Sequence, residues 1–136
     1  GVLGLSVSMN IQYPIIVGIL LFVLNVIFTS FNVYVQMWAL DILMHFLGGI
    51  TVAWFLLPCF KKEKNRISKF AWALLLVGGG ALVGVLWECY EWTLDRFVFT
   101  DGTFMGGLDD TLLDLLMDIC GASVVALVSL KKNREN

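Results

Sequence analysis

Residues 70–97 read FAWALLLVGGGALVGVLWECYEWTLDRF and join a long apolar run to a group of acids. An α-helix needs about 20 apolar residues to cross the roughly 30 Å hydrocarbon core of a bilayer. The first eighteen residues of the stretch hold no charged side chain. Glu88, Glu91 and Asp95 then follow at spacings of three and four, which places them on one face of a helix. The stretch therefore predicts a membrane-spanning helix with an acidic face near one end.

The composition of the whole chain is that of a membrane protein. The chain has 136 residues, of which 59% are hydrophobic and only 15% are charged, and its mean hydropathy is +0.85. Soluble domains are about half apolar and a quarter charged. Cys59, Cys89 and Cys120 lie singly in apolar runs, so we interpret them as small hydrophobic residues rather than as disulfide or zinc ligands.

Four segments are long and apolar enough to cross a bilayer, at about residues 13–31, 35–60, 70–97 and 108–130. Backbone polar groups in lipid must be satisfied within the segment, so these are helices. No basic region precedes the first segment and no cleavage site follows it, so we expect a retained span. We predict an all-α polytopic membrane protein, a bundle of four transmembrane helices, with residues 1–136 as one integral membrane domain.

The basic residues predict the orientation of the four spans. Eight of the nine Lys and Arg residues lie in the second connection and after the fourth span, which are on the same side of a four-span chain. Connections rich in Lys and Arg stay in the cytoplasm. We therefore expect both termini to be cytoplasmic and the acids of the third span to lie in the outer half of the membrane.

Acids and a histidine on three spans fall at similar depths. Counted from the basic flank of each span at about 1.5 Å per residue, His45, Glu88 and Asp114 lie roughly 24–28 Å above the inner side. The spacing of four between Asp41 and His45, and between Asp110 and Asp114, keeps each pair on one helix face. Small residues on the same faces, which let membrane helices approach closely, are Gly48, Gly49, Gly80, Gly84 and Gly121.

The predicted cluster has far more acids than cations. Its eight acids are Asp41, Glu88, Glu91, Asp95, Asp109, Asp110, Asp114 and Asp118, against Arg96 and His45. Uncompensated buried carboxylates are too costly to keep. Protonation of some carboxyl groups, exposure of others beyond the headgroups, or a bound cation would each relieve the cost. The alternatives to a metal are a protonated hydrogen-bond network and a proton or ion pathway.

A divalent metal suits these donors, because carboxylates with one imidazole bind Zn, Mn, Fe, Mg or Ca. The predicted ligands are His45, Glu88, Glu91, Asp110 and Asp114, with Asp41, Asp118, Gly48, Gly49 and Gly84 in support. Asp110 has an equal alternative role as the cap of the fourth helix, after the glycines at 106–107.

Three blocks, DILMHFLGG (41–49), WECYEW (87–92) and DDTLLDLLMDICGA (109–122), resemble the signatures of small bacterial membrane proteins of the YjdF type. That type is similar to the VanZ-like superfamily, named for a glycopeptide-resistance protein. The chain has Asp118 at a position where the pattern of these proteins has an amide or a small residue. The resemblance implies a multi-pass protein of the bacterial cytoplasmic membrane with a polar site facing outward.

The residues and the resemblance together favour a metal-dependent membrane protein that acts on, or binds, a lipid-linked or envelope substrate. If it is an enzyme, hydrolysis fits best, with Glu91 as the base that activates a metal-bound water. The alternatives are a non-enzymatic binder of envelope precursors and an ion- or proton-coupled transporter. Membrane lipids are expected partners and nucleic acid is not, while the oligomeric state is left open.

The predicted orientation can be tested by cysteine accessibility. We expect Lys64→Cys to react with a membrane-impermeant reagent only from the cytoplasmic side, and Gly102→Cys only from outside, because basic connections are retained in the cytoplasm. Labelling in intact cells and in inverted vesicles measures both. The reversed pattern would move the acidic cluster to the inner half of the membrane.

Overall fold

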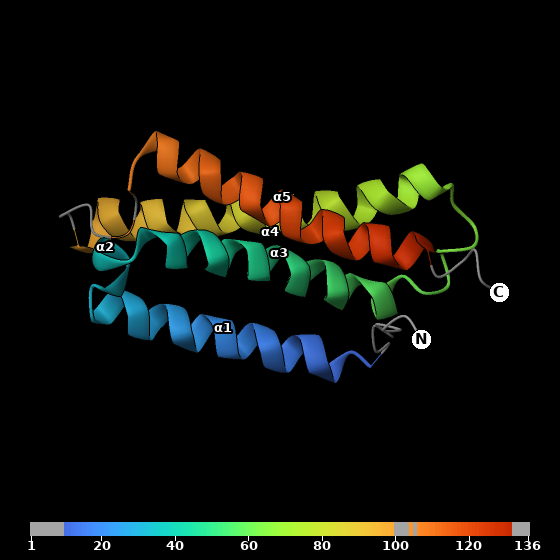
Figure 1. The fold of residues 1–136 in the computed structure, drawn as a ribbon, viewed down its shortest axis with the longest axis horizontal. Helices are drawn as coiled ribbons and strands as arrows, with labels where there is room; N and C mark the ends of the chain where they lie inside the picture. The colour runs from blue at the N-terminus through green and yellow to red at the C-terminus, as the bar shows by residue number, and fades with distance from the viewer. Residues whose placement is uncertain (1–9, 100–103, 105, 132–136) are drawn as a thin grey trace.

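The computed structural model describes residues 10–99, 104 and 106–131. Its elements are α1 (Gln12–Ser30), α2 (Val33–Gln36), α3 (Trp38–Cys59), α4 (Lys69–Leu94), a π-helical turn η1 (Asp95–Phe99) and α5 (Leu108–Lys131) (Figure 1). No strand occurs within these described ranges. The four long helices are long and apolar enough to cross a membrane, which confirms the all-helical prediction with four candidate spans.

The four long helices run side by side along the long axis of the molecule (Figure 1). The helices α3, α4 and α5 pack against one another, whereas α1 packs against α3 at the edge of the bundle. Only Pro14 is buried on α1, and the other three helices each contribute several buried residues. The bundle is therefore a three-helix core with α1 attached to one of its helices.

The apolar core fills the half of the bundle that lies toward the connection between α3 and α4. Its buried residues are Ala53, Leu57, Trp72, Leu76, Ala122, Val125 and Ala126. The indole N–H of Trp72 donates to Ser129 Oγ at 3.0 Å, and the Ser129 hydroxyl donates to the Ala126 carbonyl oxygen. A polar atom buried at this depth needs such a partner, so the hydrogen bonds join α4 to α5 within the core.

Glycines set the closest approach in the bundle, between α3 and α5. A methyl group at Gly49 would collide with the backbone carbonyl of Asp118, and one at Gly121 would collide with the carbonyl oxygen of Phe46. The two collisions are reciprocal, since each glycine lies against the backbone of the opposite helix. Small residues permit such backbone contact between membrane helices, and the contact fixes the relative height of α3 and α5.

The structure differs from the sequence prediction at the start of the second span. That span was expected to begin near residue 35, but α2 forms a separate short helix and α3 begins only at Trp38. Asn32 takes a left-handed conformation with φ of 53°, which ends α1, since asparagine tolerates this conformation better than most residues. The connection at 100–107, between the third and fourth predicted spans and expected to face outward, lies mostly outside the described residues.

The α3–α5 contact can be tested by adding single methyl groups. We expect Gly49→Ala and Gly121→Ala to lower the free energy of unfolding by about 1–3 kcal/mol, because backbone atoms cannot rotate away from the added carbon. Gly78→Ala is the matched control, since a methyl there meets nothing within 4 Å. Thermal unfolding in detergent measures the three variants, and equal melting temperatures would contradict the close contact.

Candidate functional site

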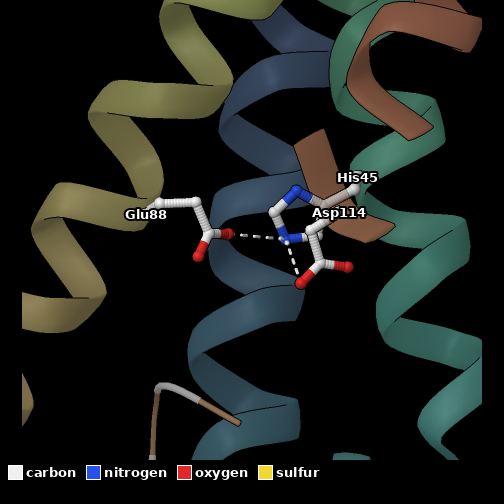
Figure 2. A group of neighbouring side chains, drawn as sticks. All are labelled: His45, Glu88 and Asp114. Carbon is white, nitrogen blue, oxygen red and sulfur yellow. Dashed lines mark ion pairs between the residues drawn. The ribbon is translucent and has the colours of Figure 1, made fainter. Parts of the chain in front are cut away.

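His45 is the centre of a buried polar group between α3, α4 and α5. Its Nε2 lies 3.8 Å from Glu88 Oε1 and 3.8 Å from Asp114 Oδ2 (Figure 2). All three residues are at least nine-tenths buried, with exposed fractions of 7% for His45, 7% for Glu88 and 3% for Asp114. Three helices therefore bring one imidazole and two carboxylates to a common point within an otherwise apolar bundle.

The other ring nitrogen of His45 is held by Asp118. Nδ1 lies 3.2 Å from Asp118 Oδ2, in a hydrogen bond that the ring N–H donates to the carboxylate. A methyl group at Gly84 of α4 would collide with the Asp118 carboxylate, so this glycine makes the room in which it sits. The contact fixes the orientation of the imidazole and leaves Nε2 facing Glu88 and Asp114.

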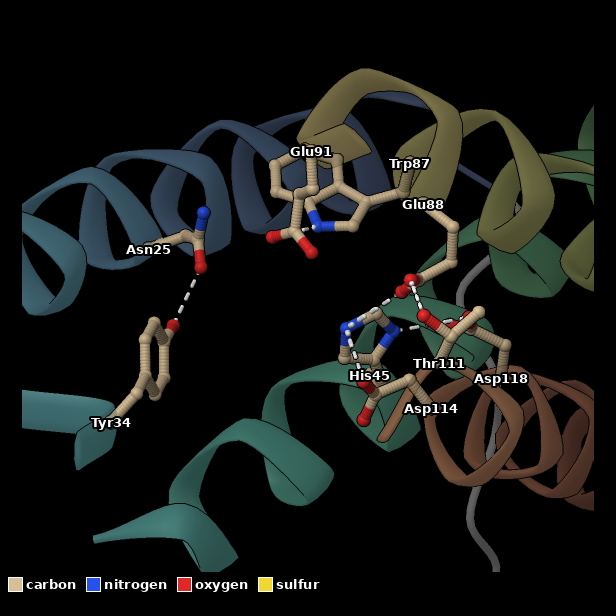
Figure 3. A network of polar contacts seen from close by, with 9 residues as sticks. All are labelled: Asn25, Tyr34, His45, Trp87, Glu88, Glu91, Thr111, Asp114 and Asp118. Atoms are coloured by element: carbon tan, nitrogen blue, oxygen red, sulfur yellow. Dashed lines mark hydrogen bonds and ion pairs between the residues drawn. The ribbon is translucent and has the colours of Figure 1, made fainter. Parts of the chain in front are cut away.

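Glu88 is positioned from α5. The Thr111 hydroxyl donates to Glu88 Oε2 at 2.8 Å, which turns the other oxygen, Oε1, toward His45 (Figure 3). Thr111 lies three residues before Asp114, so both face the same side of α5. Sequence reasoning missed Thr111, although its place in the LDDTLLD block was a signal that could have identified it.

Two buried carboxylate oxygens in this group lack a hydrogen-bond partner among the described residues. They are Glu88 Oε1 and Asp114 Oδ1. A buried polar atom without a partner costs roughly 1–3 kcal/mol, and more when it is charged. A nitrogen 3.8 Å away does not form a hydrogen bond with Glu88 Oε1. Around His45, two carboxylate oxygens therefore accept no hydrogen bond from the described part of the protein.

The spacing of the three side chains is compatible with a metal ion. One ligand atom from each of His45, Glu88 and Asp114 can be chosen so that all lie within 4.8 Å of one another. Two atoms bound to one zinc ion at about 2.1 Å in tetrahedral geometry lie about 3.4 Å apart. Small side-chain adjustments would bring the ligand atoms from within 4.8 Å of one another to the shorter separation that one zinc ion requires. A histidine that binds a metal usually donates its other N–H to a carboxylate, as His45 does to Asp118.

A second group of carboxylates adjoins the first and shares Asp114 with it. Ligand atoms of Asp41, Asp110 and Asp114 also lie within 4.8 Å of one another, but Asp41 and Asp110 are only partly buried. Asp110 lies inside the first turn of α5 rather than at its cap, because the helix begins at Leu108. Partial exposure lets water solvate these two carboxylates, so they have less need of a cation.

Glu91, a predicted ligand and candidate base, belongs to neither group. Its Oε1 accepts a hydrogen bond from the indole N–H of Trp87 at 3.0 Å, one turn earlier on the same helix (Figure 3). Glu91 is one turn from Glu88 in the sequence, but its carboxylate is engaged by the indole. The remaining predicted acids, Asp95 and Asp109, also lie outside both groups.

Tyr34 and Asn25 form a polar contact near the site that sequence reasoning missed. The Tyr34 hydroxyl donates to Asn25 Oδ1 at 2.6 Å, which joins α2 to α1 (Figure 3). Burial, followed by the negative charges of Asp41 and Glu91, raises the pKa of Tyr34 above its ordinary value. Tyr34 therefore stays protonated and remains a donor.

Comparisons with known proteins relate the chain to predicted membrane proteins. A family model described as "Predicted membrane protein (DUF2238)" matches residues 2–134. An uncharacterized protein of Thermotoga maritima is 31% identical over 102 residues, which cover 74% of this chain and 53% of that protein. The chain thus spans about half the length of this relative, and no solved structure matches it. The match over nearly the whole sequence shows that the chain belongs to the DUF2238 family of predicted membrane proteins.

Proposed function

We propose that this protein is a metal-dependent integral membrane protein that binds a divalent cation at His45, Glu88 and Asp114. The proposal is carried by two buried carboxylate oxygens without a hydrogen-bond partner, Glu88 Oε1 and Asp114 Oδ1. Glu88 Oε1 itself lies 3.8 Å from His45 Nε2, and the other oxygen of Asp114, Oδ2, lies 3.8 Å from the same nitrogen. A cation would supply the missing partner for both and offset their charge in a medium of low dielectric constant.

The donor set narrows the choice of cation. One imidazole and two carboxylates resemble catalytic zinc sites, in which three protein ligands leave the fourth position for water or substrate. Mn and Fe accept the same donors, whereas Mg and Ca prefer oxygen ligands alone. The DUF2238 chain is thus proposed to hold Zn, Mn or Fe in preference to Mg or Ca, with Asp118 as the positioning residue of His45.

The proposed role is to act on or bind a lipid-linked or envelope substrate in the outer half of the bacterial cytoplasmic membrane. A bound divalent ion would supply Lewis acidity and a water acidified for hydrolysis. Glu91, one turn beyond Glu88 on α4, is the candidate base, held in one orientation by Trp87. Support for this setting comes from the positive-inside distribution and from the resemblance to the YjdF type and the VanZ-like superfamily.

Two other functions remain as rivals. A non-enzymatic binder of envelope precursors would use the same ligands without turning over a substrate. A proton or ion transporter needs a chain of polar groups through the membrane. Below the site, the buried core of α3, α4 and α5 is apolar apart from the hydroxyls of Thr51 and Ser129, as far as the described residues show. That core disfavours a continuous relay.

The first test removes the metal. Purified protein should contain a divalent ion by elemental analysis, and a chelator should lower its melting temperature, because a ligand at a hundred times its Kd stabilises the folded state by about 2.7 kcal/mol. Added metal should restore the melting temperature. Affinity should weaken at acidic pH, because the ligands bind only when deprotonated.

Two variants on α5 control this test. We expect Asp114→Asn to lower metal affinity by more than about tenfold, since even losing the partner of a ligating histidine costs roughly 10–100-fold. Asp109→Asn removes the same charge from an exposed position on the same helix and should bind metal like the wild type. A wild type without metal that is insensitive to the chelator would refute the proposed centre.

A separate pair of variants on α4 tests whether Glu91 is a metal ligand. Glu91→Gln should keep the metal content and the chelator-dependent melting shift, because Glu91 lies outside the ligand group. Glu88→Gln should lose both, since it removes a ligand while keeping the shape of the side chain. Elemental analysis of the two purified variants makes the comparison. Loss of metal in Glu91→Gln would instead make Glu91 a ligand.

A further inference from the structure

A cavity of about 230 Å³ lies beside His45, between α1, α3 and α4. Its lining residues are contributed by α1 (Gly18, Leu21, Phe22, Asn25), α3 (Asp41, Met44, His45, Gly48, Thr51, Val52), α4 (Val83, Gly84, Trp87) and Asp118 of α5. The cavity shares His45 and Asp118 with the candidate site. It therefore leads directly to the group of buried ligands.

The loose attachment of α1 creates this space. Within the described ranges, the backbone of α1 packs against α3 and not against α4. The ring of Phe22 bridges the remaining distance to Trp87, edge to face, with centroids 6.1 Å apart. At Gly18 an added methyl would make only ordinary contact, 3.7 Å from Thr51 Cγ2. This glycine thus leaves room open, unlike Gly49, which brings two backbones together.

The cavity is more polar at one end than at the other. Asn25, Asp41 and His45 lie toward the ends of α1 and α3 that α2 connects. Gly18, Leu21, Gly48 and Val52 lie farther along the helices, toward the middle of the spans. Thr51 also lines this end, but its hydroxyl donates to the Leu47 carbonyl oxygen. This polarity matches an amphiphile whose head lies near the membrane surface and whose chain runs toward the bilayer centre.

The size of the cavity limits what it can hold. An apolar cavity of about 150 Å³ stays dry and takes a molecule as large as benzene, so this larger one can take an apolar group. Pockets for drug-sized ligands are about 300–1,000 Å³. The cavity thus has room for a segment of one hydrocarbon chain but not for a whole lipid.

We infer that the substrate of the proposed centre is a lipid, and that the part of its chain next to the headgroup enters this cavity from the bilayer. The inference rests on the proposed function. Entry lies between α1 and α4, where Phe22 and Val83 are 48% and 43% exposed and face the lipid. A chain gains little by leaving lipid for an apolar cavity, so the polar group at Asp41, His45 and the cation supplies the affinity.

The experiment uses a long-chain alkyl phosphate with a photoreactive diazirine close to its headgroup. Purified protein in detergent is irradiated with this probe, and the attachment sites are mapped by mass spectrometry. We expect attachment at the residues that line the cavity from α1 and α4, which are Gly18, Leu21, Phe22, Asn25, Val83, Gly84 and Trp87. Attachment confined to lipid-facing residues outside the lining would overturn the inference.

Two valines on α4 form a matched pair for this experiment. Val83 lines the cavity, whereas Val85 does not, and their exposed fractions are nearly equal at 43% and 44%. Val83→Phe should reduce the cavity labelling by roughly tenfold, and Val85→Phe should leave it unchanged. Gly18→Leu fills the cavity from α1 and should act like Val83→Phe, which guards against a folding defect in one variant. Equal labelling in all of them would overturn the inference.

Metal content measured on the same samples separates this inference from the proposed function. If the wild type contains metal but Val83→Phe and Val85→Phe are labelled equally, the lipid-chain inference alone is overturned. Protein without metal that still shows the difference overturns the metal centre alone. Labelling of Asp109→Asn should match the wild type, because Asp109 is exposed and neither lines the cavity nor belongs to the ligand group.

Discussion

The site depends on one contact, the reciprocal approach of α3 and α5 at Gly49 and Gly121. Each glycine lies about one helical turn from a polar residue, His45 on α3 and Asp118 on α5. When the two backbones touch, these side chains are brought to the same height, and Nδ1 reaches Asp118 Oδ2 at 3.2 Å. Packing between apolar helices thus sets the orientation of an imidazole. A side chain at either glycine would separate the helices and break that alignment.

Burial gives the arrangement its chemical meaning. Carboxylate oxygens without a protein partner are solvated when they face water, and they then give no indication of a bound cation. In a bundle surrounded by lipid, Glu88 Oε1 and Asp114 Oδ1 have no such solvent, and desolvation of an isolated charge is costly. One histidine already engaged by Asp118 cannot compensate both. The protein thus keeps buried carboxylates without partners at positions where apolar side chains would give a more stable fold. Such ionisable residues within a membrane are typically functional.

Depth and helix periodicity were enough to predict four spans and to group His45, Glu88 and Asp114, because both quantities follow from rise and angle per residue. They fix a position to about one turn but say nothing of side-chain direction. Glu91 was therefore grouped with Glu88, although its carboxylate turns to Trp87. The Tyr34–Asn25 contact depends on the break between α1 and α2 at Asn32, whose left-handed conformation no periodicity encodes.

The two halves of the bundle differ in composition, since one is an apolar core and the other contains the polar site. The half toward the α3–α4 connection is an apolar core with Trp72 satisfied by Ser129, and it supplies stability. The other half contains the polar site and, beside it, the space under α1. Because α1 contributes none of His45, Glu88 and Asp114, its looser packing leaves the cavity beside His45 without disturbing these three side chains. A site reached sideways from the bilayer and backed by an apolar core suits chemistry on a membrane-resident substrate better than passage across the membrane.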